Sequence, residues 1–353
     1  MNSKGNISWG NINFKGQSKI FDVMRGVHIN QMLRAAVKLN LFNLLAESPL
    51  TVEEIRTGLG LHGRGLIDYL DTLVSIGLLE RDQNSKDARY RNTEEISIFL
   101  VEGSPYYIGW SFEDRMQVFE QSWAALAEAL KTGKPVRQDI KDNKGKNLFH
   151  LNYQTDDGTR TFVEGMNFGQ LTSFTDFSRQ FDFSGCHTLC DIGGANGLLS
   201  VLVAGQHEHM KCINFDLPAL EPYALKKINE FGLSDRITIV NGNFFEDDFP
   251  QADIITMGNI LHDWNLEQKK LLISKAYNAL PNSGRLVVIE NIIDNERRKN
   301  TAGLLMAVQM LLVTDGGFDF TASDFDSWVQ EIGFKKTSWL DLEGNSSAII
   351  AHK

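Results

Sequence analysis

The chain has 353 residues, enough for two domains, and its 42% hydrophobic and 23% charged residues are ordinary for a globular protein. A formal net charge of −10 argues against general affinity for nucleic acid or anionic membranes. The sequence contains no apolar run long enough to span a bilayer, and its first residues lack the apolar core of a signal peptide. Three cysteines, Cys186, Cys190 and Cys212, show no metal-ligand spacing and favour a reducing cytoplasm.

The first hundred residues follow the order helix, helix, helix, hairpin. Apolar residues keep helical spacing over residues 20–45, and Thr51-Val-Glu-Glu54 is a capping box that begins a helix over 51–59. A further helix is expected over 63–76, followed by short strands at 78–81 and 88–92. This order is typical of a winged-helix domain.

Winged helices often bind DNA, but the charge of this segment opposes that function. Residues 1–105 contain twelve Lys or Arg and twelve Asp or Glu, and the third helix has Arg64 against Asp68 and Asp71. Phosphate contacts need a basic face. We therefore expect a dimerisation domain over residues 1–103, with no nucleic-acid partner.

Residues 104–183 are expected to link the two domains. Their aromatic residues (Tyr106, Tyr107, Trp110, Phe112, Phe119, Trp123) have helix-like spacing and suit a substrate cavity, a core or a subunit interface. A helix over 159–182 leads into the last domain, 184–353.

The segment Thr188–Gly197 predicts a strand, a tight glycine loop and the start of a helix. Gly193 and Gly194 allow close approach of a ligand, or simply a tight turn. Asp191 ends the strand, where ligands bind in open α/β sheets. A second strand ends in Asp216, about 20 residues on, the spacing at which a carboxylate meets a ribose diol. Carboxylates suit a cationic nucleoside such as S-adenosylmethionine better than a pyrophosphate.

Strands and helices alternate to residue 293, which predicts a mostly parallel sheet with helices on both faces. Helices over 303–314 and 323–332 then precede two strands, 335–340 and 347–352, joined by a short turn. A hairpin at the edge of a parallel sheet is the ending of a methyltransferase. The fold class is therefore α/β, a Rossmann-like class I methyltransferase sheet behind a mainly α winged-helix domain.

His262 follows the fourth strand of this sheet, at its carboxyl edge. A histidine there can act as a general base near neutral pH. It can equally be a surface residue beside a helix start, with Asp263 or Asn265 as the N-cap.

Several motifs together resemble the S-adenosylmethionine-dependent O-methyltransferases of the caffeate, acetylserotonin and polyketide-tailoring type. They are Lys131-Thr-Gly-Lys-Pro135, Phe162-x-x-Gly-Met166, Asp191-Ile-Gly-Gly194, Phe215-Asp-Leu-Pro218, Gly242-Asn-Phe-Phe245, Leu261-His-Asp-Trp264 and Thr314–Thr321. The resemblance covers nearly the whole chain.

The resemblance implies a role for each matching position. His262 is the implied catalytic base, with Glu290 and Asp319 orienting it. The implied cofactor residues are Asp191, Gly193, Gly194, Asp216, Leu217, Asn243, Phe244 and Asn259. The implied substrate residues are Phe162, Met166, Trp264, Met306 and Met310. No metal is implied.

The implied activity is methylation of a hydroxyl on a small apolar or aromatic acceptor by a cytoplasmic homodimer. An enzyme of the same scaffold that binds S-adenosylmethionine without methylating is the alternative. Five positions depart from the family pattern: Ala195, Asn196, Asn243, Ala307 and Phe320. Ala307 and Phe320 are expected near the acceptor, so its identity does not follow from the resemblance.

Overall fold

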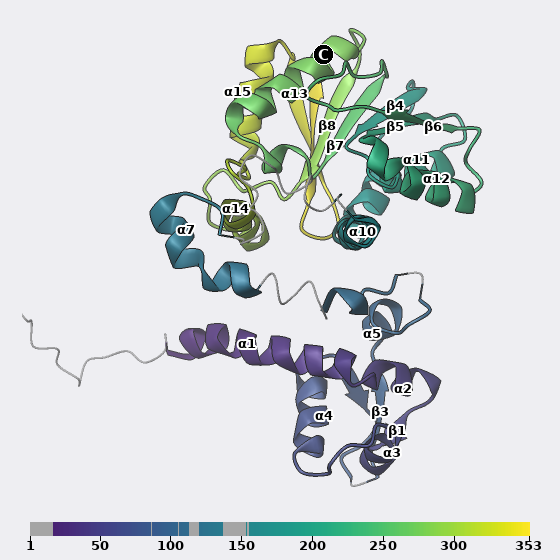
Figure 1. The fold of residues 1–353 in the computed structure, drawn as a ribbon, viewed down its shortest axis with the longest axis vertical. Coiled ribbons are helices and arrows are strands. Elements are labelled where there is room, and N and C mark those ends of the chain that lie inside the picture. Colours follow the sequence, from purple (N-terminus) through teal and green to yellow (C-terminus); the bar gives the residue numbers. More distant parts are fainter. Residues whose placement is uncertain (1–16, 86, 105, 113–119, 137–152, 154) are drawn as a thin grey trace, which may run out of the picture. The chain divides into compact units, whose positions relative to one another are not determined.

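The computed structural model describes residues 17–85, 87–104, 106–112, 120–136, 153 and 155–353. The chain divides into two compact units, Met1–Gln117 and Val118–Lys353 (Figure 1). The aromatic segment expected over 105–135 lies partly outside the described residues, as does the loop expected over 136–147.

The first unit is helical with a small antiparallel sheet in the strand order β1-β3-β2. Its elements are α1 (Gln17–Lys38), α2 (Leu41–Glu47), β1 (Leu50–Thr51), α3 (Val52–Gly58), α4 (Leu66–Ser75), β2 (Leu79–Arg81), β3 (Arg89–Asn92), α5 (Glu94–Phe99) and η3 (Gly109–Phe112). The capping box at Thr51 is present, with Thr51 accepting the backbone N–H of Glu54. The helices expected over 51–59 and 63–76 and the hairpin are therefore confirmed.

Two features of the first unit differ from the sequence prediction. The apolar run over 20–45 forms two helices rather than one, because Asn40 between them adopts a left-handed backbone with φ 62°. Asparagine tolerates this conformation better than other residues with a side chain. The short elements β1 and α5 were not predicted; β1 has only two residues, too few for a periodic signal.

The second unit contains a seven-stranded sheet in the order β6-β5-β4-β7-β8-β10-β9. Its elements are α7 (Leu126–Thr132), α10 (Asp156–Gln180), β4 (Thr188–Ile192), α11 (Leu198–Gln206), β5 (Lys211–Asp216), η4 (Pro218–Leu220), α12 (Glu221–Glu230), β6 (Ile237–Asn241), β7 (Ile254–Gly258), η5 (Leu261–Asp263), α13 (Leu266–Ala279), β8 (Arg285–Glu290), α14 (Thr301–Val313), α15 (Ala322–Ile332), β9 (Lys336–Asp341) and β10 (Ser347–His352).

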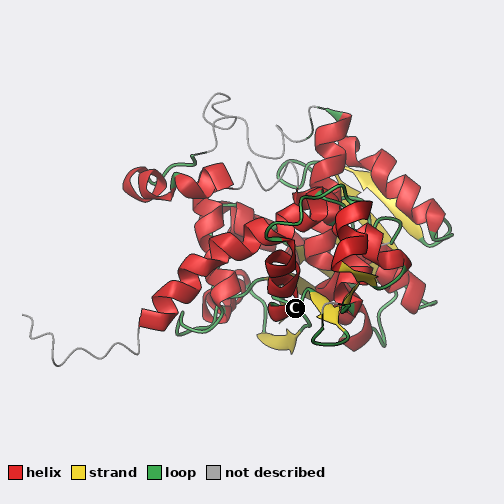
Figure 2. Ribbon diagram, turned by 90° about the horizontal axis from the view of Figure 1, so that it is seen from below, coloured by secondary structure: helices red, strands yellow, loops and turns green. Residues whose placement is uncertain are grey.

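Five strands of this sheet are parallel, and the hairpin β9–β10 closes one edge in antiparallel register, with Ser347 of β10 opposite Glu290 of β8. Helices cover both faces (Figures 1 and 2). Since neighbouring strand residues point to opposite faces, alternate residues fill two separate cores. Cys190, Val288 and Ile349 pack with α13 and α15, whereas Leu189, Val287 and Ile350 pack with α10, α11 and α12. The expected methyltransferase sheet is confirmed.

Both strand cysteines, Cys190 and Cys212, are buried and unpaired, as expected of core residues. No described helix is long and apolar enough to cross a membrane. The loops that follow β4, β5, β6, β7 and β8 all leave the sheet at its carboxyl edge. The residues expected to bind the cofactor and to catalyse lie at the ends of these strands or in the loops after them, except Asp319, which lies between α14 and α15.

Candidate active site

The glycine loop after β4 is packed too closely for side chains. A Cβ on Gly194 would lie 2.1 Å from Oδ1 of Asn214, and one on Gly193 would lie 2.3 Å from Cδ1 of Ile260. Gly193 also has φ 72°, in the region that favours glycine. The loop is therefore packed tightly against Asn214 of β5 and against Ile260, which follows β7.

Asp216 at the end of β5 holds this loop in place. Its Oδ2 accepts the backbone N–H of Ala195 at 2.8 Å, and its Oδ1 accepts the backbone N–H of Leu217 at 2.7 Å. A carboxylate has about four acceptor positions, so two remain for the hydroxyls of a ribose. The same side chain can thus shape the loop and bind the sugar.

Asp191 is a second carboxylate at this edge and is buried, and its Oδ1 accepts the hydroxyl of Thr256 at 2.7 Å. Burial raises the pKa of Asp191 to about 7, although the Thr256 hydrogen bond opposes the shift. Burial likewise raises the pKa of Asp216 to about 6. No cation among the described residues lowers the pKa of either carboxylate, and a ligand with a sulfonium and an ammonium group supplies a positive charge. The residues present therefore fit S-adenosylmethionine.

The resemblance assigns Asn243 and Phe244 to the adenine, and Phe244 lies beside the glycine loop. The ring of Phe244 is 3.9 Å from the position of a Cβ on Gly193. Oδ1 of Asn243 accepts the N–H of Phe245 at 3.0 Å, which leaves one lone pair of that oxygen for the adenine amino group. Asn259 has φ 52°, and its buried Oδ1 has no hydrogen-bond partner among the described residues. An unpartnered buried acceptor is suited to a ligand.

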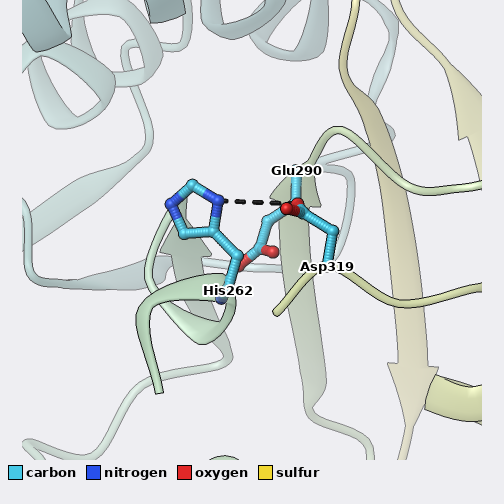
Figure 3. A group of neighbouring side chains, drawn as sticks. All are labelled: His262, Glu290 and Asp319. Atoms are coloured by element: carbon cyan, nitrogen blue, oxygen red, sulfur yellow. Dashed lines mark hydrogen bonds and ion pairs between the residues drawn. The ribbon is translucent and has the colours of Figure 1, made fainter. Parts of the chain in front are cut away.

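His262 lies in the short turn η5 and is buried, with 6% of its surface exposed. Its Nδ1 is 3.5 Å from Oδ1 of Asp319 (Figure 3). Its Nε2 is 3.6 Å from Oδ1 of Asp263. Asn265, and not Asp263, caps helix α13. The interpretation of His262 as a surface residue at a helix start is therefore wrong.

Glu290 reaches the same turn from the end of β8, but it contacts the backbone rather than the imidazole. Its Oε1 accepts the N–H of Leu261 at 2.7 Å and the N–H of His262 at 3.3 Å. Its Oε2 and both carboxylate oxygens of Asp319 are buried without hydrogen-bond partners among the described residues. Burial of three carboxylates around one imidazole makes the site strongly negative.

The charges in this cluster determine how it titrates. Burial lowers the pKa of His262, but the negative charges of Asp263, Asp319 and Glu290 outweigh burial and raise that pKa to about 10. Burial raises the pKa of Glu290 to about 7 and that of Asp263 to about 6, against the attraction of His262. The cluster thus retains protons at neutral pH, and a neutral imidazole becomes more populated as the pH rises.

One ligand-type atom each of His262, Glu290 and Asp319 lies within 4.8 Å of the others. Geometry alone would let a metal ion bridge them. The resemblance implies no metal, and this stays a prediction, because Oε2 of Glu290 and both carboxylate oxygens of Asp319 have no hydrogen-bond partner among the described residues.

The residues expected at the acceptor are less closely grouped. Trp264 packs edge-on against Phe244 and Phe245, with ring centroids 5.7 and 4.6 Å away, and so lies on the side expected for the adenine. Met306 and Met310 pack on α14 in an apolar cluster with Leu126 of α7. Phe162 and Met166 are half-buried on α10.

Two further residues of this unit bear on the acceptor. Phe320 is fully buried and stacks on Phe325 in the core, with centroids 6.0 Å apart, and its place near the acceptor stays a prediction. Tyr153 was not identified from the sequence. Its ring meets that of Phe162 edge-on at 5.8 Å, and burial together with the charges of Asp216 and Asp263 raises its pKa. A tyrosine between predicted helices gives no periodic signal.

Comparison with known proteins agrees with this geometry. A family model for the O-methyltransferase dimerisation domain matches residues 21–102, and one for the O-methyltransferase domain matches residues 123–335. The fold and these matches define a class I methyltransferase that uses S-adenosylmethionine. The chain belongs to the O-methyltransferase family and is an enzyme of that family.

Three relatives illustrate the breadth of the family. The chain is 30% identical to the tetracenomycin polyketide synthesis 8-O-methyl transferase TcmO of Streptomyces glaucescens, over 96% of this chain and 97% of TcmO. It is 32% identical to the N,N-dimethyltransferase OxyT of Streptomyces rimosus, over 87% of this chain and 88% of OxyT. The structure of human N-acetylserotonin methyltransferase in complex with S-adenosylmethionine superposes with a TM-score of 0.84 at 26% identity. The match covers 98% of this chain and 99% of the human chain. The non-methylating alternative is not favoured.

Proposed function

We propose that the protein transfers the methyl group of S-adenosylmethionine to a hydroxyl of a small apolar or aromatic acceptor, with His262 as general base. The observation that carries this proposal is the buried His262 imidazole with Nδ1 facing Asp319 at 3.5 Å. A carboxylate on that side stabilises the imidazolium that forms when the other ring nitrogen takes a proton. Asp319 is thus the orienting partner of the ring, and Glu290 positions the turn.

When bound, S-adenosylmethionine supplies a methyl group attached to a positively charged sulfur. The sulfur is a good leaving group, because it becomes neutral when its bond to the methyl carbon breaks. Asp216 would hold the ribose and Asp191 would face the positive charges, while Asn243 and Phe244 would contact the adenine. Leu217, Gly193, Gly194 and Asn259 complete this cofactor site. His262 accepts the hydroxyl proton on Nε2 as the acceptor oxygen bonds to the methyl carbon. Fixing both reactants supplies the alignment that in-line displacement needs.

The names of the relatives suggest which atom is methylated and what kind of molecule carries it, and we state both as proposals. TcmO is named for methylation of a polyketide oxygen, whereas OxyT is named for methylation of nitrogen. We propose a hydroxyl on a ring system, bound near Phe162, Met166, Tyr153, Met306 and Met310. Half-buried aromatic and methionine side chains suit a flat apolar molecule. Trp264 would border this region from the adenine side.

The test is a mass-spectrometric screen of phenolic and aromatic amine compounds for the mass gain of one methylene in the presence of S-adenosylmethionine. Methylated phenols would support the proposal. Methylation of amines alone would show that nitrogen is the acceptor atom.

We also propose a cytoplasmic homodimer formed through its N-terminal domain, residues 1–103, with 104–183 as a linking region and 184–353 as the catalytic domain. The match to a dimerisation domain supports this, as does an apolar surface on α1 with Ile20, Val23, Met24 and Val27 between 58% and 75% exposed. Obligate dimers bury large apolar surfaces. The three unpaired buried cysteines support the compartment. Light scattering that gave the 39.7 kDa mass of one chain would contradict the dimer.

A further inference from the structure

Lys269 is a fully buried lysine beside the candidate active site, and the proposed reaction does not use it. Its side chain is 0% exposed in helix α13. Burying an ammonium group is costly unless it is paired. The contacts that Lys269 makes therefore show what compensates its charge.

The ammonium group of Lys269 connects two segments. It donates a hydrogen bond to the backbone carbonyl of Trp264, two residues after His262. It also lies 3.5 Å above the ring centre of Phe318 and 6.0 Å from that of Phe320, the residues on either side of Asp319. Cation–π contacts at such distances are attractive, more so when desolvated. One side chain thus contacts both the segment that carries His262 and the segment that carries Asp319.

The charges around Lys269 are those of the catalytic cluster. Burial lowers the pKa of Lys269 to about 8, and the negative charges of Glu290, Asp319 and Asp263 oppose that shift. The same three carboxylates raise the pKa of His262, so the imidazole and the Lys269 ammonium interact with one shared set of negative charges. Lys269 adds a positive charge to this buried set, and at neutral pH that charge offsets part of the negative charge of the carboxylates.

We propose that Lys269 is a positioning residue for methyl transfer: it joins the His262 turn to the Asp319 segment and offsets the negative charge around the imidazole. Removing the ammonium leaves three carboxylates to hold a proton on His262 more tightly. The neutral imidazole then forms only at higher pH. This inference rests on the proposed role of His262, but the placement of Lys269 can be tested without activity.

The test uses Lys269→Met, which keeps an unbranched apolar side chain and removes the charge. The matched control is Lys270→Met, because Lys270 is the next residue on α13 and pairs with Glu331 at 2.6 Å on the surface. The ring signals of His262, assigned by their loss in His262→Ala, are followed by NMR titration. We expect the midpoint of His262 to rise by about one pH unit in Lys269→Met and to stay unchanged in Lys270→Met.

The pH dependence of single-turnover methyl transfer gives a second readout. Its acidic limb should move to higher pH in Lys269→Met, and Lys269→Arg should restore it towards wild type. Unchanged titration and an unchanged pH profile in folded Lys269→Met would show a purely structural lysine and overturn the proposal. If instead His262→Ala stays active, the base assignment fails, while the NMR midpoint still reports on Lys269.

If Lys269→Met does not fold, the coupling between Lys269 and the carboxylates can be measured on Lys269 itself. The titration of the Lys269 ammonium is followed in wild type and in Asp319→Asn. Loss of a neighbouring negative charge should lower its midpoint by about one pH unit. An unchanged midpoint would show that Lys269 and the cluster are not coupled, and would contradict the proposal.

Discussion

The carboxylate of Glu290 accepts the backbone N–H of Leu261 at 2.7 Å. The same oxygen accepts the N–H of His262 at 3.3 Å. Glu290 therefore anchors the turn that carries the imidazole, while Asp319 faces the ring itself. The two acidic residues act on different parts of His262, and their substitutions should differ accordingly.

Glu290→Gln should be milder than Glu290→Ala. The glutamine amide oxygen can still accept both N–H groups, whereas alanine leaves two buried donors unpaired at a cost of about 1–3 kcal/mol each. We expect the alanine variant to lose both stability and single-turnover rate, and the glutamine variant to retain most of its stability. Denaturant unfolding and single-turnover methyl transfer measure the two effects. In combination with His262→Ala, either substitution should slow the reaction little further, because groups that act as a unit are not additive.

Asp216→Ala should weaken binding of S-adenosylmethionine. It removes the acceptor proposed for the ribose and also the acceptor of the Ala195 and Leu217 N–H groups, with an expected loss of about 1–3 kcal/mol. Titration calorimetry measures the affinity, and the exposed Asp248→Asn on the neighbouring loop is the control. Equal affinity in wild type and Asp216→Ala would remove Asp216 from the cofactor site.

Cofactor affinity should rise with pH. The pKa values of Asp191 and Asp216 are raised to about 7 and about 6, so both carboxylates are partly protonated in mildly acidic solution. A cationic ligand binds the ionised forms, and binding should release protons below these pKa values. We expect affinity to increase about ten-fold or more between about pH 5.5 and about pH 8. S-adenosylhomocysteine, which lacks the sulfonium charge, should show a smaller increase. Calorimetry in two buffers measures how many protons are released on binding. An affinity that does not change with pH would mean that neither carboxylate faces the cation.

Removal of metal ions should leave the activity intact. His262, Glu290 and Asp319 lie close enough to bind an ion, but the proposed chemistry assigns them to proton transfer and positioning. Incubation with a chelator followed by single-turnover methyl transfer is the measurement. A loss of activity that Zn²⁺ or Mg²⁺ restores would assign the cluster to a metal instead.

Much of the fold could be predicted because its signals are local. The glycine loop, Asp216 at a strand end and the alternation of strands and helices are readable along the sequence. The division of the first apolar run into two helices at Asn40 could not be predicted, since the helical spacing of apolar residues continues across Asn40. Nor could periodicity show that Lys269 is buried against the ring of Phe318, or that Glu290 accepts the backbone N–H groups of a turn. These features depend on contacts between segments far apart in sequence.

The central claim is that His262 removes the acceptor proton, and the direct measurement is single-turnover methyl transfer by His262→Ala on an identified acceptor. The rate should fall by about 10²–10⁴-fold, while calorimetry shows unchanged affinity for S-adenosylmethionine and the exposed control His187→Ala keeps full activity. In wild type the rate should also rise with pH above neutrality, because the pKa of His262 is raised to about 10. Near-normal turnover in His262→Ala with bound cofactor would contradict the account.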